Sequence, residues 1–185
     1  MAYATADQLR LWLRLDEAFT ADEQEQAELL LDLAAGAIED ETGQPLEQAD
    51  DVAVLDGSGT GKLILPRWPV TAIASVTLLD SGDVLTEGVQ EDYTWSKAGI
   101  LFRRCGRWPC EPQAVEVDYT AGYSPVPAGL QRIALRLAGD AWNNPARLAS
   151  ETLGDHARSW ATPGEANMEL SEADRRTLTQ YKART

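Results

Sequence analysis

TADEQEQAELLLDLAAGAIEDETG, residues 20–43, decides the fold that the sequence predicts. Thr20 and Glu23 have the spacing of a capping box, and Gly43 with Pro45 ends the segment. Between these signals, apolar residues recur at three- and four-residue intervals, which predicts an amphipathic helix. They are Ala27, Leu30, Leu31, Ala34, Ala35 and Ile38. A second apolar row follows the first, so we expect this helix to be covered on two sides. It consists of Leu29, Leu33 and Ala37.

The same six-position pattern returns after Pro127 and stops at Asn143-Asn144-Pro145. Its members are Leu130, Ile133, Ala134, Leu137, Ala138 and Ala141. Two helices with matching, alanine-rich faces are natural packing partners. Capping-box spacing also predicts a short first helix beginning after Thr5 and a short last helix beginning after Ser171.

Between the two matching helices, short β-type runs alternate with glycine-containing turns. The runs lie at residues 52–55, 63–65, 73–79, 93–95, 100–102 and 115–119. We therefore predict an α+β fold in which a β-rich insertion interrupts a small helical bundle. The bundle has two N-terminal helices, one long central-to-C-terminal helix and a short C-terminal helix. The predicted segments are 1–51 and 123–160 for the bundle, 52–122 for the insertion and 161–185 for a C-terminal tail with the last short helix.

Composition excludes several classes of protein. Two cysteines and one histidine among 185 residues cannot form a disulfide scaffold or close a four-ligand zinc site. The apolar runs are too short for a membrane span, and the start MAYATADQLR lacks the pattern of a secretory signal. The net charge is −14, and residues 1–51 alone carry −12. Ordinary binding to DNA phosphates, which relies on Lys and Arg, is therefore not expected.

Three motifs could suggest chemistry. Gly57–Lys62 resembles a phosphate loop, but Asp56 stands where the first glycine is needed and Leu63 where the hydroxyl residue is needed. Cys105 and Cys110 lie in a basic segment, RRCGRWPCE, without metal-ligand spacing. His156 has Asp155 and Ser159 nearby, but neighbours in sequence seldom have triad geometry. We expect no catalytic residue, no cofactor and no metal, and a flexible turn at Gly57–Lys62.

The order of the segments resembles the head-to-tail adaptor (connector) proteins of long-tailed double-stranded DNA bacteriophages. The resemblance spans roughly residues 5–160, and its most specific part is the third segment below followed by the fourth. The segments are TADQLRLWLRL with the helix quoted above, LDGSGTGKLILPRWPVTAIASVTLLD (55–80), VEVDYTAGYSPVPAGLQRIALRLAGDAWNNP (115–145) and SETLGDHARSW (150–160).

This resemblance implies a structural virion protein. Such proteins assemble as a ring of about twelve copies between the portal protein and the next neck or tail protein, with heterologous contacts between copies. DNA passes through the central channel. The C-terminal segment of relatives often reaches into the portal. By analogy, the candidate portal contacts here are Trp160, Leu170, Arg175, Arg176, Leu178 and Tyr181.

The acidic charge fits that role. A channel lined by carboxylates repels DNA phosphates, whereas arginines would grip them. Our hypothesis is that an acidic row on the helix of residues 20–43 faces the channel or its rim: Glu25, Glu28, Asp32 and Glu39. Repulsion between identical acidic copies predicts a monomer or small oligomer that forms its ring on the portal.

Three other readings stay open from the sequence. The chain could be another phage neck or tail-completion protein of similar architecture. It could be a small nucleotide-binding enzyme using Gly57–Lys62. It could also be an acidic mimic of DNA, which would need its carboxylates on one exposed surface and a basic protein partner. For the leading reading we expect a location in the virion neck, and in the host cytoplasm during assembly.

Overall fold

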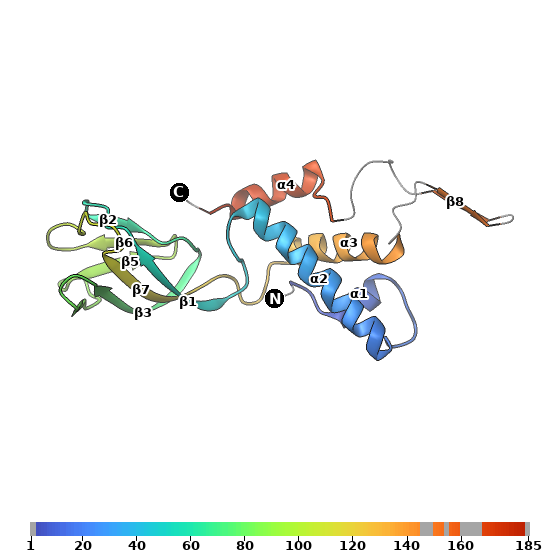
Figure 1. The fold of residues 1–185 in the computed structure, drawn as a ribbon, viewed down its shortest axis with the longest axis horizontal. Helices are drawn as coiled ribbons and strands as arrows, with labels where there is room; N and C mark the ends of the chain where they lie inside the picture. The colour runs from blue at the N-terminus through green and yellow to red at the C-terminus, as the bar shows by residue number, and fades with distance from the viewer. Residues whose placement is uncertain (1–2, 145–149, 154–155, 160–167, 184–185) are drawn as a thin grey trace. The chain divides into compact units, whose positions relative to one another are not determined.

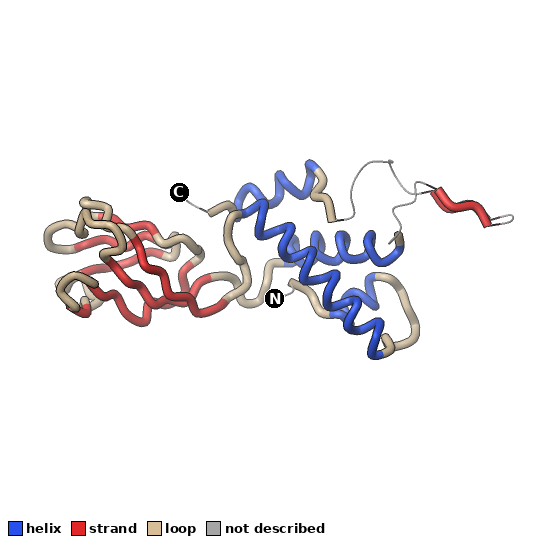
Figure 2. The backbone as a smooth tube through the Cα atoms, viewed as in Figure 1, coloured by secondary structure: helices blue, strands red, loops and turns tan. Residues whose placement is uncertain are grey.

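The computed structural model describes residues 3–144, 150–153, 156–159 and 168–183. The chain divides into two compact units, here called the helical unit and the β unit. The helical unit consists of Met1–Thr42 and Val126–Gln180, and the β unit of Gly43–Pro125 and Tyr181–Thr185. Figures 1 and 2 show helices gathered in one unit and the two larger sheets in the other. The predicted α+β class is confirmed.

Four α-helices lie in the described part of the helical unit: α1 (Ala6–Trp12), α2 (Ala21–Thr42), α3 (Ala128–Asn143) and α4 (Glu172–Leu178). A 3₁₀ turn, Thr179–Tyr181, continues α4. The capping boxes predicted at Thr5 and Ser171 are both present, with Gln8 and Asp174 as their partners. Thr20 and Glu23 exchange hydrogen bonds in the same way at the start of α2. Gly43 follows α2 with φ of +72°, the left-handed conformation that ends many helices.

The predicted packing of the two alanine-rich helices is confirmed. Ala27 and Leu31 of α2 share a buried cluster with Ala138 of α3, and Leu30 packs at its edge. Ile133 is also fully buried. Small side chains let helices pack closely. A small residue also lies where α1 meets α3, because Trp12 of α1 packs against Gly139 of α3.

The second apolar row of α2 differs from its prediction. Leu29 and Leu33 are 59% and 52% exposed in the single chain. Helical periodicity identifies an apolar face but does not say whether its partner lies in the same chain. The cover expected on a second side of α2 is limited to its C-terminal half, where Ala37 is partly buried.

The β unit contains two antiparallel sheets. One has the order β1 (Ala49–Leu55), β7 (Val115–Ala121), β3 (Val70–Leu78), β4 (Asp83–Val84). The other has the order β2 (Lys62–Ile64), β6 (Ile100–Arg103), β5 (Tyr93–Ser96). All six predicted runs lie in or next to these strands, whereas the two-residue β4 has no counterpart in the prediction. The core between the sheets includes Val76, Leu101, Trp108, Val117 and Tyr119.

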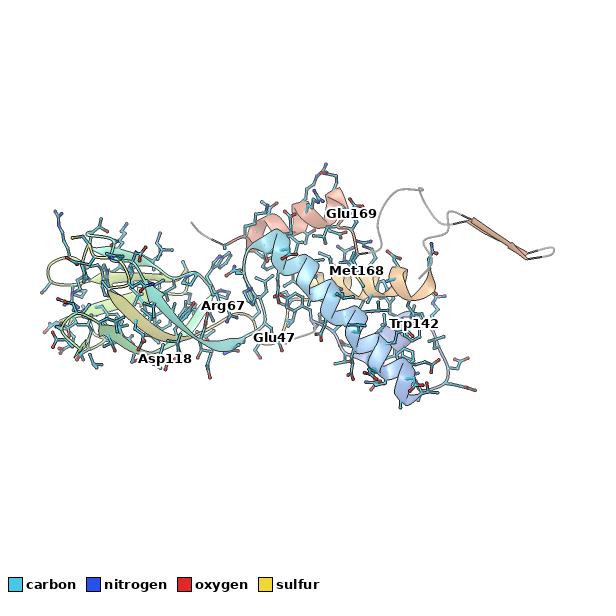
Figure 3. The ribbon with its side chains drawn as sticks, in the orientation of Figure 1. Glu47, Arg67, Asp118, Trp142, Met168 and Glu169 are labelled. Carbon is cyan, nitrogen blue, oxygen red and sulfur yellow. The ribbon has the colours of Figure 1, made fainter. Side chains whose placement is uncertain are left out.

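One arginine is buried within this unit. Arg67 is only 8% exposed, and its Nη2 donates to the backbone carbonyl of Glu47 at 3.0 Å (Figure 3). Its Nη1 lies 3.7 Å from Asp51 Oδ2, which also accepts a hydrogen bond from the Tyr119 hydroxyl. Burial, followed by the negative charge of Asp51, raises the pKa of Tyr119 far above its ordinary value. A buried charge needs such partners, so Arg67 ties the start of β1 to β7.

A small two-stranded sheet follows α3 in the chain. Strands β8 (Ser150–Leu153) and β9 (His156–Ser159) pair antiparallel, with Glu151 opposite Arg158. The amino-acid pattern predicts no strand at these positions. In the described part of the chain, no helix is long and apolar enough to cross a membrane.

Candidate interaction surfaces

Three of the four residues of the acidic row lie exposed on α2. Glu25, Glu28 and Asp32 follow one another at spacings of three and four residues, so their side chains share one side of the helix. Glu39 lies on the same side but is half-buried, because its Oε1 accepts the hydroxyl hydrogen bond of Tyr3 at 2.8 Å. The structure therefore brings the four together, with Glu39 fixed to the N-terminal segment.

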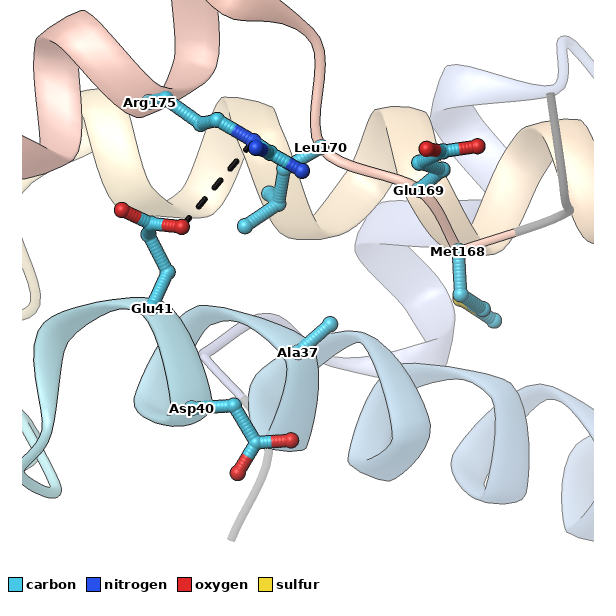
Figure 4. Close-up of a pocket in the computed structure, with 7 residues that line it drawn as sticks. All are labelled: Ala37, Asp40, Glu41, Met168, Glu169, Leu170 and Arg175. Carbon is cyan, nitrogen blue, oxygen red and sulfur yellow. Dashed lines mark ion pairs between the residues drawn. The ribbon is translucent and has the colours of Figure 1, made fainter.

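A shallow, open pocket of about 310 Å³ lies where the C-terminal half of α2 faces the segment that leads into α4 (Figure 4). Two candidate portal contacts, Leu170 and Arg175, line it, and Arg175 Nε lies 4.0 Å from Glu41 Oε2. The remaining lining residues are Ala37, Asp40, Glu41, Met168 and Glu169. Small-molecule sites are typically enclosed and lined mostly by apolar residues. This pocket is open and has charged walls, which suits a contact with another protein better.

Helix α4 is held in place by Asp174, whose spacing from Ser171 predicts only a capping box. Asp174 is 2% exposed and receives hydrogen bonds from Ser171 and, at 2.6 Å, from Nη2 of Arg136 on α3. Burial alone would raise the pKa of Asp174, but the Ser171 hydrogen bonds and the Arg136 charge outweigh it and lower the pKa below its usual value. The charged carboxylate therefore holds α4 against α3.

The candidate portal contacts of the C-terminal region are not equally accessible. Leu178 is fully buried, so in this conformation it anchors α4 rather than meeting a partner. Arg175 and Arg176 are exposed, and Leu170 is half-buried. Trp160 lies outside the described residues.

Tyr181, the last candidate, belongs to the β unit. Its ring meets Tyr123 edge to face at 5.6 Å, and its carbonyl accepts a 2.8 Å hydrogen bond from Gln44 Nε2. The next carbonyl, of Lys182, accepts from Trp68 Nε1 at 3.0 Å. No local sequence signal predicts this docking, since its partners lie far from Tyr181 in the chain.

The loop Gly57–Lys62, here called the glycine-rich loop, is a structural platform that supports a neighbouring segment of the chain. Its backbone exchanges hydrogen bonds with the segment from Arg103 to Glu111: Gly57 N with the Glu111 carbonyl, Gly59 N with that of Pro109, and the Thr60 carbonyl with Trp108 N. A Cβ atom at Gly57 would overlap the Pro109 carbonyl. Strand β2 follows the loop, whereas a phosphate loop continues into a helix whose N-terminus faces the phosphate.

The platform supports an exposed turn, here called the basic turn, Arg103–Arg107. The amide of Arg103 donates to the Gly61 carbonyl, and the guanidinium of Arg103 lies over the buried ring of Trp108 at 5.6 Å. Arg104 Nε donates to the carbonyl of Val89, a residue that is 70% exposed. Arg104, Cys105 and Arg107 are exposed.

The described residues contain no group of three or more His, Cys, Asp and Glu side chains that could hold a metal ion. Cys105 and Cys110 are exposed and form no disulfide with each other. His156 lies on β9, and the arrangement of its side chain is outside what the structure describes. What the described residues offer instead are the exposed surfaces above: the acidic row, the C-terminal region and the basic turn.

Comparisons with known proteins find one matching family and several chains of similar fold. The family model described as head completion protein matches residues 3–144. No curated protein matches the chain. Among solved structures, a chain from the neck of an empty gene transfer agent particle, computed with C6 symmetry, shares 18% identity at a TM-score of 0.59; the match covers 99% of this chain and 91% of the other. A chain from the neck of the native particle, computed with C12 symmetry, has the same identity and TM-score, with 97% and 88% covered. These likenesses establish a shared fold.

Proposed function

The chain belongs to the head completion protein family, whose members are structural proteins rather than enzymes, and from this we propose that it forms a ring-shaped head-to-tail adaptor in the neck of a phage-like particle. The ring would join the portal to the next neck or tail protein. The observation that carries the proposal is the family match over residues 3–144, which includes α1, α2, α3 and the sheets of the β unit.

The ring is supported by the symmetry of the similar particles. The necks that contain those chains were computed with C6 and C12 symmetry, and a closed ring of about twelve copies is compatible with both. Exposed apolar side chains in the single chain are also consistent with contacts between copies: Leu29 and Leu33 on α2 would be covered in the ring.

The acidic row is our candidate for the channel wall. Every copy would place Glu25, Glu28 and Asp32 on the same level of the ring, which multiplies the negative potential along the channel. DNA phosphates would be repelled from the wall and could slide past it. Glu39, held by Tyr3, would lie deeper in the same wall.

The C-terminal region is our candidate for the portal contact. Arg175 and Arg176 are exposed cations, and Leu170 offers partly accessible apolar surface beside them. Leu178 would support this surface from inside. Tyr181 would have to leave Tyr123 to take part, and Trp160 remains a proposed contact outside the described residues.

Electron microscopy of the protein mixed with the portal from its own particle tests the adaptor. We expect the protein alone to sediment as a monomer or small oligomer, and rings to appear on one face of the portal. Stable rings without portal would contradict templated assembly, and an unoccupied portal would contradict the adaptor itself. Rings on tail-tube protein instead would favour a tail-completion protein.

The channel assignment has its own test. Portal-bound rings carrying Glu25→Lys and Glu28→Lys should retain linear double-stranded DNA in a gel shift at low salt and release it as salt rises. The control carries Asp16→Lys and Glu17→Lys, the same change of charge on the loop before α2. Equal DNA retention by the two variants would remove the acidic row from the channel.

A further inference from the structure

A second row of side chains on α2 has no role in the channel. Asp22, Gln26, Leu29 and Leu33 follow one another at spacings of four, three and four, and Asp40 continues the line. We call these five residues the leucine stripe. At 100° per residue, the stripe lies about a quarter turn around the helix from the acidic row. A channel-facing acidic row would therefore turn the leucine stripe sideways, toward the next copy in a ring.

The stripe has the surface of a contact and not of a solvated helix. All five side chains are exposed, including more than half of each leucine. Covering both leucines would remove apolar area worth roughly 1–3 kcal/mol for each from water. Near Asp40, Arg175 of α4 pairs with Glu41. Helix α2 itself contains no lysine or arginine, so every charged side chain that it contributes beside the stripe is acidic. Its complement must be apolar and basic.

The basic turn of the β unit fits that requirement. Arg104 and Arg107 are exposed cations, and Arg104 is fixed against Val89, whose side chain is exposed. The glycine-rich loop holds the turn on both sides, because Gly61 accepts from the Arg103 amide and Thr60 accepts from the amide of Trp108, the residue after the turn. Apolar and cationic groups thus lie side by side, as the stripe demands.

We propose that the leucine stripe on α2 of one copy is covered by the basic turn and Val89 of the neighbouring copy. This inference rests on the proposed ring and identifies its subunit contact. The contact is heterologous, since two different surfaces of the chain meet, and a heterologous contact forms a ring when the rotation between successive copies closes. It also offsets the repulsion between copies, because each acidic α2 meets arginines.

Thiol cross-linking tests the contact, because Cys105 lies within the basic turn. The variant Gln26→Cys, in a Cys110→Ser background, is assembled on the portal and treated with a short bismaleimide. We expect a ladder of covalent oligomers on a denaturing gel. The ladder should vanish when Cys105→Ser is added, and a control with Asp16→Cys in place of Gln26→Cys should give none.

Assembly of substituted chains provides a second readout. Leu29→Glu with Leu33→Glu, or Arg104→Glu with Arg107→Glu, should abolish rings on the portal without unfolding the chain. Leu11→Glu, at a leucine of α1 that is 65% exposed, is the matched control and should assemble. Normal rings of both double variants, or rings of the Gln26→Cys chain that give no covalent ladder, would overturn this contact and leave the adaptor intact. Failure of the wild-type chain to form rings at all would instead refute the proposed function.

Discussion

Arg136 Nη2 on α3 and Asp174 Oδ2 on α4 lie 2.6 Å apart, and this ion pair joins the C-terminal helix to the rest of the helical unit. The Asp174 carboxylate at the same time accepts hydrogen bonds from the amide and the hydroxyl of Ser171, and the Asp174 amide donates back to the Ser171 hydroxyl oxygen. One carboxylate therefore both starts α4 and fixes its position. Because Arg175 and Arg176 project from this helix, the pair also determines where the proposed portal contacts lie.

Replacing Asp174 by Ala should destabilise the helical unit by about 2–3 kcal/mol, since the guanidinium of Arg136 loses a buried partner and α4 loses its cap. Urea unfolding monitored by circular dichroism measures the change. Glu172→Ala removes an exposed carboxylate from the same turn and serves as the control. Equal midpoints for the two variants would contradict this role of Asp174.

The same pair predicts a pH dependence. The pKa of Asp174 is lowered in the folded chain, so the carboxylate stabilises the fold at pH values above its ordinary pKa, and that contribution is lost as the pH falls through the lowered value. The difference in unfolding free energy between wild type and Asp174→Asn should be constant from pH 7 to about 5 and shrink below about 4. Both chains share every other acidic group, so the difference isolates Asp174. A difference that grows on acidification would refute it.

Local patterns were enough to predict the helices and most of the strands. The repeated six-position template placed α2 against α3, and the spacing of Thr5 with Gln8 and Ser171 with Asp174 located two caps. The strand pair of residues 150–153 and 156–159 was missed because neither run has alternating apolar residues. The sequence signal that could have found it is the dipeptide Gly154-Asp155 between two runs of four residues.

The candidate surfaces were less predictable, because they depend on tertiary contacts. Leu178 and Leu29 are both apolar members of a helical pattern, yet one is buried and the other exposed. Nothing in the neighbourhood of Arg67 indicates that its guanidinium would be buried beside Asp51. Burial of a short helix or a single arginine is set by segments distant in sequence, which periodicity does not report.

Gly57→Ala should destabilise the β unit by about 1–3 kcal/mol, because the new methyl group would overlap the Pro109 carbonyl and push the two segments apart. Gly61 is the matched control: a Cβ atom there meets no neighbouring atom within 4 Å. The midpoint temperature of thermal unfolding should therefore fall for Gly57→Ala and change little for Gly61→Ala. The reverse order would refute the platform role of the loop.

Nucleotides should leave the stability of the chain unchanged, because the backbone groups of the glycine-rich loop already form hydrogen bonds with the segment from Arg103 to Glu111. A ligand at 100 times its Kd would add about 2.7 kcal/mol to the unfolding free energy. Thermal unfolding with ATP, GTP and dinucleotides measures this directly. A clear rise in midpoint with any of them would restore the nucleotide-binding enzyme as an alternative.

Gln44 should control the docking of the C-terminal residues on the β unit. Its side chain is 3% exposed, donates to the Tyr181 carbonyl and accepts from the backbone amide of Trp68, both at 2.8 Å. Gln44→Ala leaves both partners unsatisfied, at a cost of about 1–3 kcal/mol each if they stay buried, so release of the segment becomes the favoured outcome. Trypsin should then cleave after Lys182 faster than in the wild type, as followed by mass spectrometry of the intact chain.

Gln44→Glu keeps the acceptor but replaces the donor by a carboxylate that repels the Tyr181 carbonyl, and it should release the segment as well. Gln48→Ala, which removes an exposed hydrogen bond to Thr71, should not. Identical cleavage in all four chains would mean that the edge-to-face contact between the aromatic side chains of Tyr181 and Tyr123 holds the segment without help from Gln44.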